Sequence, residues 1–237
     1  MLELQPSILT RRGEDPGIDW QKACTCFAML PEKIAVEMWP TPREMSRVQI
    51  SDNAAKKWRT SIGTALAVGL PWDGDEPVDV YPGDTVIVHP QDGKRIEGFR
   101  AGGYYAEHEV RLYGIYVDVN EYGYPREVPW DESILAKVVM GKIQAVGKNV
   151  AIKLPKLAEI TDEGIYLPDR MRDHADRAIV QSHGCNMRHK FFLNGEFRTL
   201  RVGDAIQYER RALKQVGVDE DLSMAIIPED GIYLVEA

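Results

Sequence analysis

The chain has 237 residues, of which 44% are hydrophobic and 28% are charged, and its formal net charge is −8. This length allows one large domain or two smaller ones, and the composition is that of a chain with an apolar core, not of a disordered one. The negative charge argues against non-specific binding to nucleic acids or anionic membranes, because both are polyanions.

The compartment is predicted from what the sequence lacks. No apolar run approaches the ~20 residues needed to cross a bilayer, and residues 1–15 have no basic start followed by an apolar stretch. The cysteines Cys24, Cys26 and Cys185 are odd in number and lack the spacing of a disulfide framework. We therefore expect a cytoplasmic protein in a reducing compartment.

Short runs rich in β-branched residues, separated by Gly, Pro, Asp or Asn, dominate the chain and predict an all-β protein with barrel or sandwich architecture. The predicted strands are 33–38, 64–68, 85–88, 149–154, 178–180, 205–208 and 224–227. A helical pattern occurs between Ile18 and Leu30, and a turn or two is expected between Ser51 and Arg59.

Four sequence blocks occur twice in the same order, which predicts two homologous β-domains. The paired blocks are 34–36 with 150–152, 67–69 with 182–184, 81–87 with 201–207, and 129–138 with 228–237. The expected division is an N-terminal extension at 1–30, a first domain at 31–140, a connector at 141–146 and a second domain at 147–237. The first domain has extra residues after its Gly-Asp turn, and these predict an enlarged hairpin at about 91–126.

The second repeat resembles the chaperonin-10 family, the GroES-type co-chaperonins. The resemblance is carried by Val150-Ala151-Ile152-Lys153, Glu163-Gly164-Ile165-Tyr166-Leu167-Pro168, Leu200-Arg201-Val202-Gly203-Asp204 and Val235-Glu236-Ala237. The first repeat is similar but more divergent. The resemblance implies two tandem GroES-like irregular β-barrels, similar to the double-domain co-chaperonins of chloroplasts and to divergent co-chaperonins carried by bacteriophages.

In that family, a loop that ends in a hydrophobic tripeptide docks between two helices of the chaperonin-60 apical domain. The matching residues here are Ile165, Tyr166 and Leu167, with Gly164 as a hinge. The corresponding residues of the first repeat are Val48, Gln49 and Ile50. The resemblance implies a non-enzymatic co-chaperonin that caps a chaperonin-60 ring, encloses non-native clients and forms a homo-oligomer. ATP would be bound by the partner, so no cofactor is expected here.

The energetics of such a loop favour docking in several copies. Burial of Ile, Tyr and Leu contributes roughly 1.5–3 kcal/mol each, whereas ordering a segment costs about 2–5 kcal/mol or more. One loop would therefore bind weakly, and several on one scaffold gain avidity of about 10² to 10⁴. Two alternatives are open. The tripeptide could be the next strand of the barrel, or the chain could be a structural or assembly protein, such as a virion component, that binds no chaperonin.

Three further residue patterns have a structural interpretation as well as a functional one. His183, Cys185 and His189 could be metal ligands, but no fourth ligand accompanies them. Carboxylates are expected to be surface charges, and no catalytic motif is present. The enlarged hairpin is rich in tyrosines that either form a binding surface or pack on each other: Tyr104, Tyr105, Tyr113, Tyr116, Tyr122 and Tyr124.

Overall fold

The computed structural model describes residues 16–40, 61–70, 78–89, 92–114, 116–119, 125–127, 129–154, 177–193, 195–209, 212, 214–215 and 224–236. Strands predominate in these residues and the helices are short, which confirms the predicted all-β class. None of the helices in the described residues is long and apolar enough to cross a membrane.

All seven predicted strands are present within a few residues of their expected bounds. The elements of the first half are α2 (Trp20–Cys26), β1 (Ile34–Met38), β2 (Ser61–Val68), β3 (Thr85–Val88), β4 (Lys94–Ile96), β5 (Arg100–Ala101), β6 (Tyr104–Tyr105), β7 (Val110–Tyr113), β8 (Tyr116–Val119), β9 (Pro125–Glu127), α4 (Trp130–Ser133), β10 (Ile134–Val139) and β11 (Lys142–Ala145). Those of the second half are β12 (Asn149–Lys153), β13 (Arg177–His183), β14 (Phe191–Leu193), β15 (Glu196–Arg198), β16 (Ala205–Tyr208), β17 (Lys214–Gln215), β18 (Met224–Pro228), η2 (Glu229–Gly231) and β19 (Ile232–Val235).

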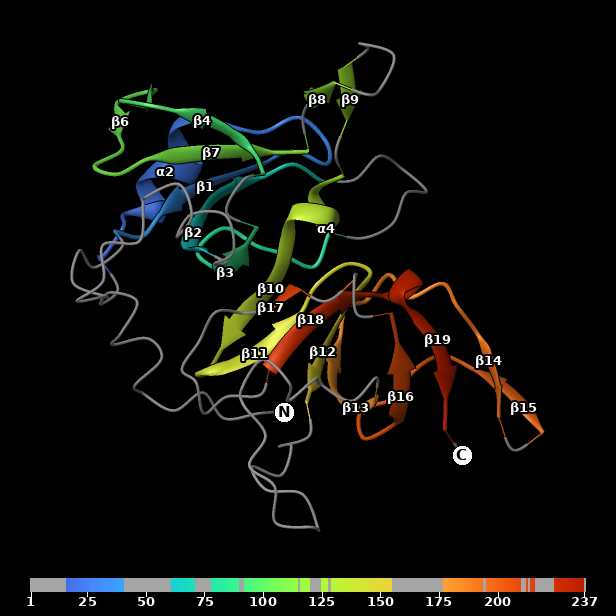
Figure 1. Ribbon diagram of the computed structural model, residues 1–237. Coiled ribbons are helices and arrows are strands. Elements are labelled where there is room, and N and C mark those ends of the chain that lie inside the picture. The colour runs from blue at the N-terminus through green and yellow to red at the C-terminus, as the bar shows by residue number, and fades with distance from the viewer. Residues whose placement is uncertain are drawn as a thin grey trace, which may run out of the picture.

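Two antiparallel sheets contain most of these strands, and six strands of each follow the same order. The order is β10-β3-β2-β1-β7-β4 in the first sheet and β19-β16-β13-β12-β18-β17 in the second. The first sheet has one additional strand, β11, which pairs with the outer edge of β10 (Figure 1). Among the described strands neither sheet closes on itself, so the barrel architecture stays a prediction.

The registers of the two sheets also agree. The pairing of β1 with β2 shifts between Ala35 and Val36, and the pairing of β12 with β13 shifts between Ala151 and Ile152. These bulges lie at equivalent positions of the first sequence block. A bulge bends and twists the strand that contains it, so both sheets are curved at the same point.

The two Gly-Asp turns before β3 and β16 have the same geometry. Gly83 has a φ of 91° and Gly203 a φ of 94°, a backbone conformation that glycine adopts without strain. The side chain of the following residue accepts a hydrogen bond from the backbone N–H three residues before it, at 2.9 Å for Asp84 and 2.8 Å for Asp204. The sequence block therefore marks the same turn in both halves.

The extra residues of the first half fall in two places. In the β4–β7 hairpin, Lys94 lies opposite Leu112, as Lys214 lies opposite Ile226 in the β17–β18 hairpin. The first hairpin is longer and includes the small β5–β6 sheet. A second addition, which contains the β8–β9 sheet, lies between β7 and α4.

The last sequence block is aligned one residue differently in the structure. Pro129 precedes α4 and Pro228 precedes η2, as the sequence alignment predicts. Because α4 is longer than η2 by one residue, Ile134 begins β10 where Ile232 begins β19. The paired sequence blocks 129–138 and 228–237 place Ile134 opposite Tyr233. The structure corrects this pairing, because Ile134 is equivalent to Ile232.

The described residues form four clusters of buried apolar side chains. Two belong to the first half and its flanking segments, and one belongs to the second half. The fourth joins the halves, because it combines Leu135 of β10 and Ile143 of β11 with Ala151 and Ile226 of the second sheet. In Figure 1, β10 and β11 extend from the first sheet towards β12 and β18. The connector is thus part of the core.

Replacing Ile143 with alanine should destabilise the protein, because its side chain is 1% exposed. We expect Ile143→Ala to lower the free energy of unfolding by about 2–5 kcal/mol, measured by urea denaturation. The control is Val202→Ala, at a side chain 58% exposed, which should change stability by less than about 0.5 kcal/mol. Equal effects of the two variants would contradict a core role for the connector.

Candidate functional site

The predicted partner-binding residues lie outside the described residues. These are Gly164, Ile165, Tyr166 and Leu167 in the second half, and Val48, Gln49 and Ile50 in the first. The strands on either side of them are described. Residues 155–176 belong to the connection between β12 and β13, and residues 41–60 belong to the connection between β1 and β2. Both candidate segments therefore join the equivalent pair of strands in their sheet.

The points where these two segments leave the sheets are well anchored. At the end of β12, Leu154 is 2% exposed and belongs to the core of the second half. After β1, Trp39 is buried and its Nε1 donates a hydrogen bond of 2.8 Å to Oγ1 of Thr64 in β2. A segment held at such fixed ends can present side chains to a partner from a rigid scaffold.

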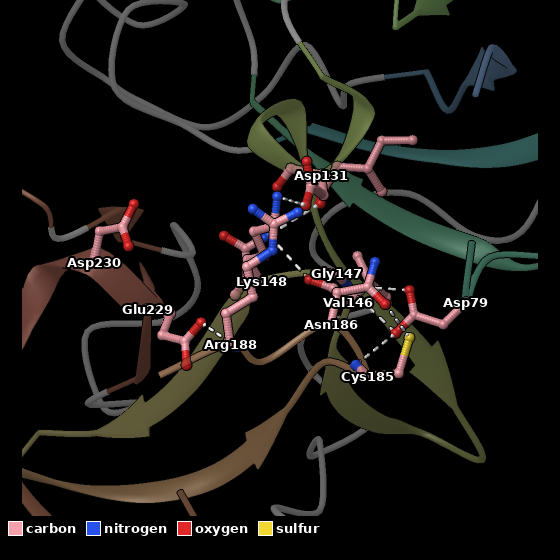
Figure 2. Close-up of polar contacts among 12 residues, drawn as sticks. Asp79, Asp131, Val146, Gly147, Lys148, Cys185, Asn186, Arg188, Glu229 and Asp230 are labelled. Carbon is pink, nitrogen blue, oxygen red and sulfur yellow. Dashed lines mark hydrogen bonds and ion pairs between the residues drawn. The ribbon is translucent and has the colours of Figure 1, made fainter. Parts of the chain in front are cut away.

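The scaffold depends on a polar junction between the halves, shown in Figure 2. The carboxylate of Asp79, which precedes β3, accepts hydrogen bonds from the backbone N–H groups of Gly147 at 3.1 Å and Cys185 at 3.3 Å. On the second sheet, Ser182 Oγ accepts a hydrogen bond of 3.0 Å from the N–H of Ala145. These contacts tie the first half and the connector to β13 and the turn after it.

Asn149, the first residue of β12, makes the most buried of these polar contacts. Its Nδ2 donates hydrogen bonds to the carbonyl oxygens of Asp131 at 2.6 Å and Val146 at 3.0 Å. Asn149 is 2% exposed, and a buried amide without partners would be costly. Its hydrogen bonds therefore fix α4 and the end of the connector relative to the start of the second sheet.

The same junction affects the chemistry of Cys185. Burial, together with the nearby Asp79 carboxylate, raises the pKa of the Cys185 thiol to about 11. A thiolate is the reactive form of cysteine, so this thiol should react slowly near neutral pH. The backbone N–H of Cys185 bonds to Asp79, so this residue contributes to the junction.

Removing the Asp79 charge should make Cys185 more reactive. Asp79→Asn keeps an acceptor for Gly147 but removes the negative charge that raises the thiol pKa, so the thiolate fraction at pH 9 should increase. We expect iodoacetamide to alkylate Cys185 several-fold faster, with the rate followed by mass spectrometry. The alkylation rate of Cys24, on α2, serves as the internal control and should not change. An unchanged rate at Cys185 would contradict the influence of the Asp79 charge.

The His183, Cys185 and His189 trio has separate partners in the structure. His183 Nδ1 lies 2.9 Å from the carbonyl oxygen of Gly184, and His189 Nε2 lies 2.8 Å from Oδ1 of Asp230. Cys185 Sγ lies 2.9 Å from Oδ1 of Asn186. Within the described ranges, no group of three or more His, Cys, Asp or Glu side chains is placed to bind a metal ion.

Buried carboxylates contradict the expectation that the acidic residues lie on the surface, and the most deeply buried are Glu37 and Glu229. Glu37 is 1% exposed, and its Oε1 accepts hydrogen bonds from the N–H groups of Glu107 and His108, at 3.1 and 3.0 Å. Glu229 is 2% exposed and accepts from the N–H groups of Arg188 and His189, at 2.8 and 2.7 Å. Each carboxylate holds a turn that is distant in the sequence. The position of Glu37 inside an apolar strand is a signal of its burial but not of the residues that it contacts.

The tyrosines of the enlarged region have different environments. Tyr104 is buried and donates a hydrogen bond to Oε2 of Glu37, while Tyr113 is buried in the core of the first half. Tyr105 is 62% exposed, with the guanidinium of Arg100 5.3 Å from its ring centroid. Tyr122, Tyr124 and the side chain of Tyr116 lie outside the described part. The described tyrosines therefore do not form one binding surface.

Comparisons with known proteins do not assign the chain to a family. A scan against protein-family models and a search of curated proteins found no match for the chain. The resemblance to the chaperonin-10 family thus depends on the sequence blocks given above. Any function drawn from it is a proposal.

Proposed function

We propose that the chain is a co-chaperonin that caps a chaperonin-60 ring and assists ATP-dependent folding of the enclosed client. Docking would use Ile165, Tyr166 and Leu167, with Gly164 as the hinge. The observation that carries the proposal is the position of this tripeptide. It belongs to the connection between β12 and β13, whose ends are fixed on a rigid sheet.

We also propose that the halves are two GroES-type barrels derived from one ancestral unit. Support comes from the shared order of six strands, the equivalent bulges in β1 and β12, and the matching turns at Gly83 and Gly203. If the two halves had arisen independently, the same strand order, bulge positions and turns would not be expected in both. In this proposal the connector holds the two barrels in one body.

The docking energy of each chain would be small. A tripeptide that contributes roughly 1.5–3 kcal/mol per buried side chain must first offset the cost of ordering its segment, about 2–5 kcal/mol or more. Binding through a single copy is therefore weak, whereas an oligomer that presents several copies binds with higher avidity. Weak individual contacts also permit release after the partner hydrolyses ATP.

The first half is proposed to dock less strongly. Its corresponding tripeptide has a polar residue, Gln49, between Val48 and Ile50, and it lacks the preceding glycine. Pro40 and Pro42 near its base restrict the backbone. Each chain would then offer one strong and one weak contact to the ring.

The test is ATP-dependent binding to purified chaperonin-60. Leu167→Asp places a charge where an apolar side chain must be buried, so we expect at least tenfold weaker binding by surface plasmon resonance. Leu157→Asp, in the same segment but outside the tripeptide, should bind like the wild type. Ile50→Asp should have a smaller effect than Leu167→Asp. Wild-type binding by Leu167→Asp, with an unchanged circular dichroism spectrum, would refute the assignment.

The alternative function is a structural or assembly protein that uses GroES-like barrels for self-association. It is favoured by exposed apolar side chains in both halves, including Leu70 at 79% and Phe197 at 72%. A protein of this kind would show no binding to chaperonin-60 with ATP present. The wild-type measurement above therefore separates the two functions.

A further inference from the structure

The β14–β15 hairpin forms a small sheet apart from the two large ones. Its register places Phe192 opposite Phe197 and Phe191 opposite Arg198. In Figure 1 the hairpin projects from the second half, on the side away from the first half. No described strand pairs with the outer edge of β14 or of β15. Both edges therefore carry backbone N–H and C=O groups with which another strand can pair.

Both ends of this hairpin are fixed to the second half. Before β14, the Glu229 carboxylate accepts hydrogen bonds from the N–H groups of Arg188 and His189, at 2.8 and 2.7 Å. At the end of β15, the Arg198 guanidinium donates two hydrogen bonds to the Asp204 carboxylate, at 2.7 and 2.9 Å. A bidentate contact of this kind is strong and directional. The hairpin is therefore held in one orientation before a partner arrives, which lowers the entropy cost of binding.

One face of the hairpin presents an exposed aromatic pair. Phe192 is 64% exposed and Phe197 is 72% exposed, and their ring centroids are 5.0 Å apart. Because residues directly opposite each other in a sheet share a face, the two rings form one apolar patch. A phenylalanine buries about 150–250 Å² when it is fully covered, so the patch offers roughly 200–340 Å². A stable interface between folded proteins takes about 800 Å² from each partner, so this patch suits a short segment.

The charge of the hairpin region is opposite to that of the whole chain. Residues 187–202 contain four basic side chains and one acidic side chain, which gives a charge of +3, against −8 for the whole chain. Arg198 is paired with Asp204, whereas Lys190 and Arg201 are exposed. This charge attracts a negatively charged partner. It also disfavours contact between the hairpins of two copies, because like charges would meet.

We propose that the β14–β15 hairpin binds an extended, negatively charged segment of another protein, in which apolar side chains alternate with acidic ones. The segment pairs with an outer edge of the hairpin as a third strand. Alternation follows from strand geometry, because successive side chains point to opposite faces. The apolar side chains on one face then cover Phe192 and Phe197. The inference goes beyond the proposed function and does not depend on chaperonin binding.

The first test is binding of a labelled synthetic peptide to the full chain, measured by fluorescence anisotropy. The peptide alternates valine with glutamate over the length of a strand, and a control peptide has lysine in place of glutamate. We expect the wild type to bind the acidic peptide at least tenfold more tightly than the basic one, and Phe192→Ser combined with Phe197→Ser to weaken binding at least tenfold. Tyr105→Ser, at a side chain 62% exposed in the first half, is the matched control and should bind like the wild type. No binding of the acidic peptide by the wild type, or wild-type binding by the folded double variant, would overturn the proposal.

The second test locates the peptide by hydrogen exchange of the wild-type chain. Backbone N–H groups within 191–198 should exchange more slowly when the acidic peptide is bound, because an added strand protects the edge that it covers. Protection that spares the hairpin would overturn the proposal. Tighter binding of single-stranded oligothymidylate than of the acidic peptide would make a nucleic acid the occupant, and self-association that the double variant loses would make it a second copy. Either result would also overturn the proposal.

Discussion

Burial of the connector between two sheets is the interaction on which the arrangement of this chain depends. The backbone of β11 pairs with β10 of the first sheet, while Ile143 packs with Ala151 and Ile226 of the second. The apolar contact is supplemented by the Asp79 carboxylate and the Asn149 amide, which bind backbone groups across the junction. A short connector with these contacts cannot act as a loose linker. The chain therefore presents its two candidate docking segments from one body.

The repeated strand order of the two sheets has a physical consequence for their edges. A strand edge exposes N–H and C=O groups that pair with any suitable strand, and the first sheet satisfies its β10 edge with the connector. The second sheet ends at β19, and no described strand pairs with the outer edge of β19. The same type of edge is thus paired within the chain in the first half, and in the second half no described strand pairs with it.

Much of the fold could be predicted from local sequence, because β-branched runs and Gly-Asp turns act over short distances. The strands around Val36 and Ile206, the turns at Gly83 and Gly203, and a helix between Ile18 and Leu30 follow from such patterns. Contacts between distant residues could not be predicted. Glu37 holds a turn some seventy positions further along the chain, and no local pattern marks that pairing. The candidate docking residues were found by family resemblance alone, since a partner-binding tripeptide has no role in the core that a hydrophobic pattern would reveal.

The pairing of β12 with β18 has a consequence for synthesis of the protein. On the ribosome, the nascent chain can complete the first sheet once β11 has emerged, because all seven of its strands precede residue 146. In contrast, β12 can pair along both of its edges only after β18 has been synthesised. Long-range pairing of this kind is slow and exposes apolar strands to aggregation. A translation pause or truncation between β13 and β18 would therefore leave a fully paired first sheet joined to a second half whose apolar strands lack partners and are prone to aggregate.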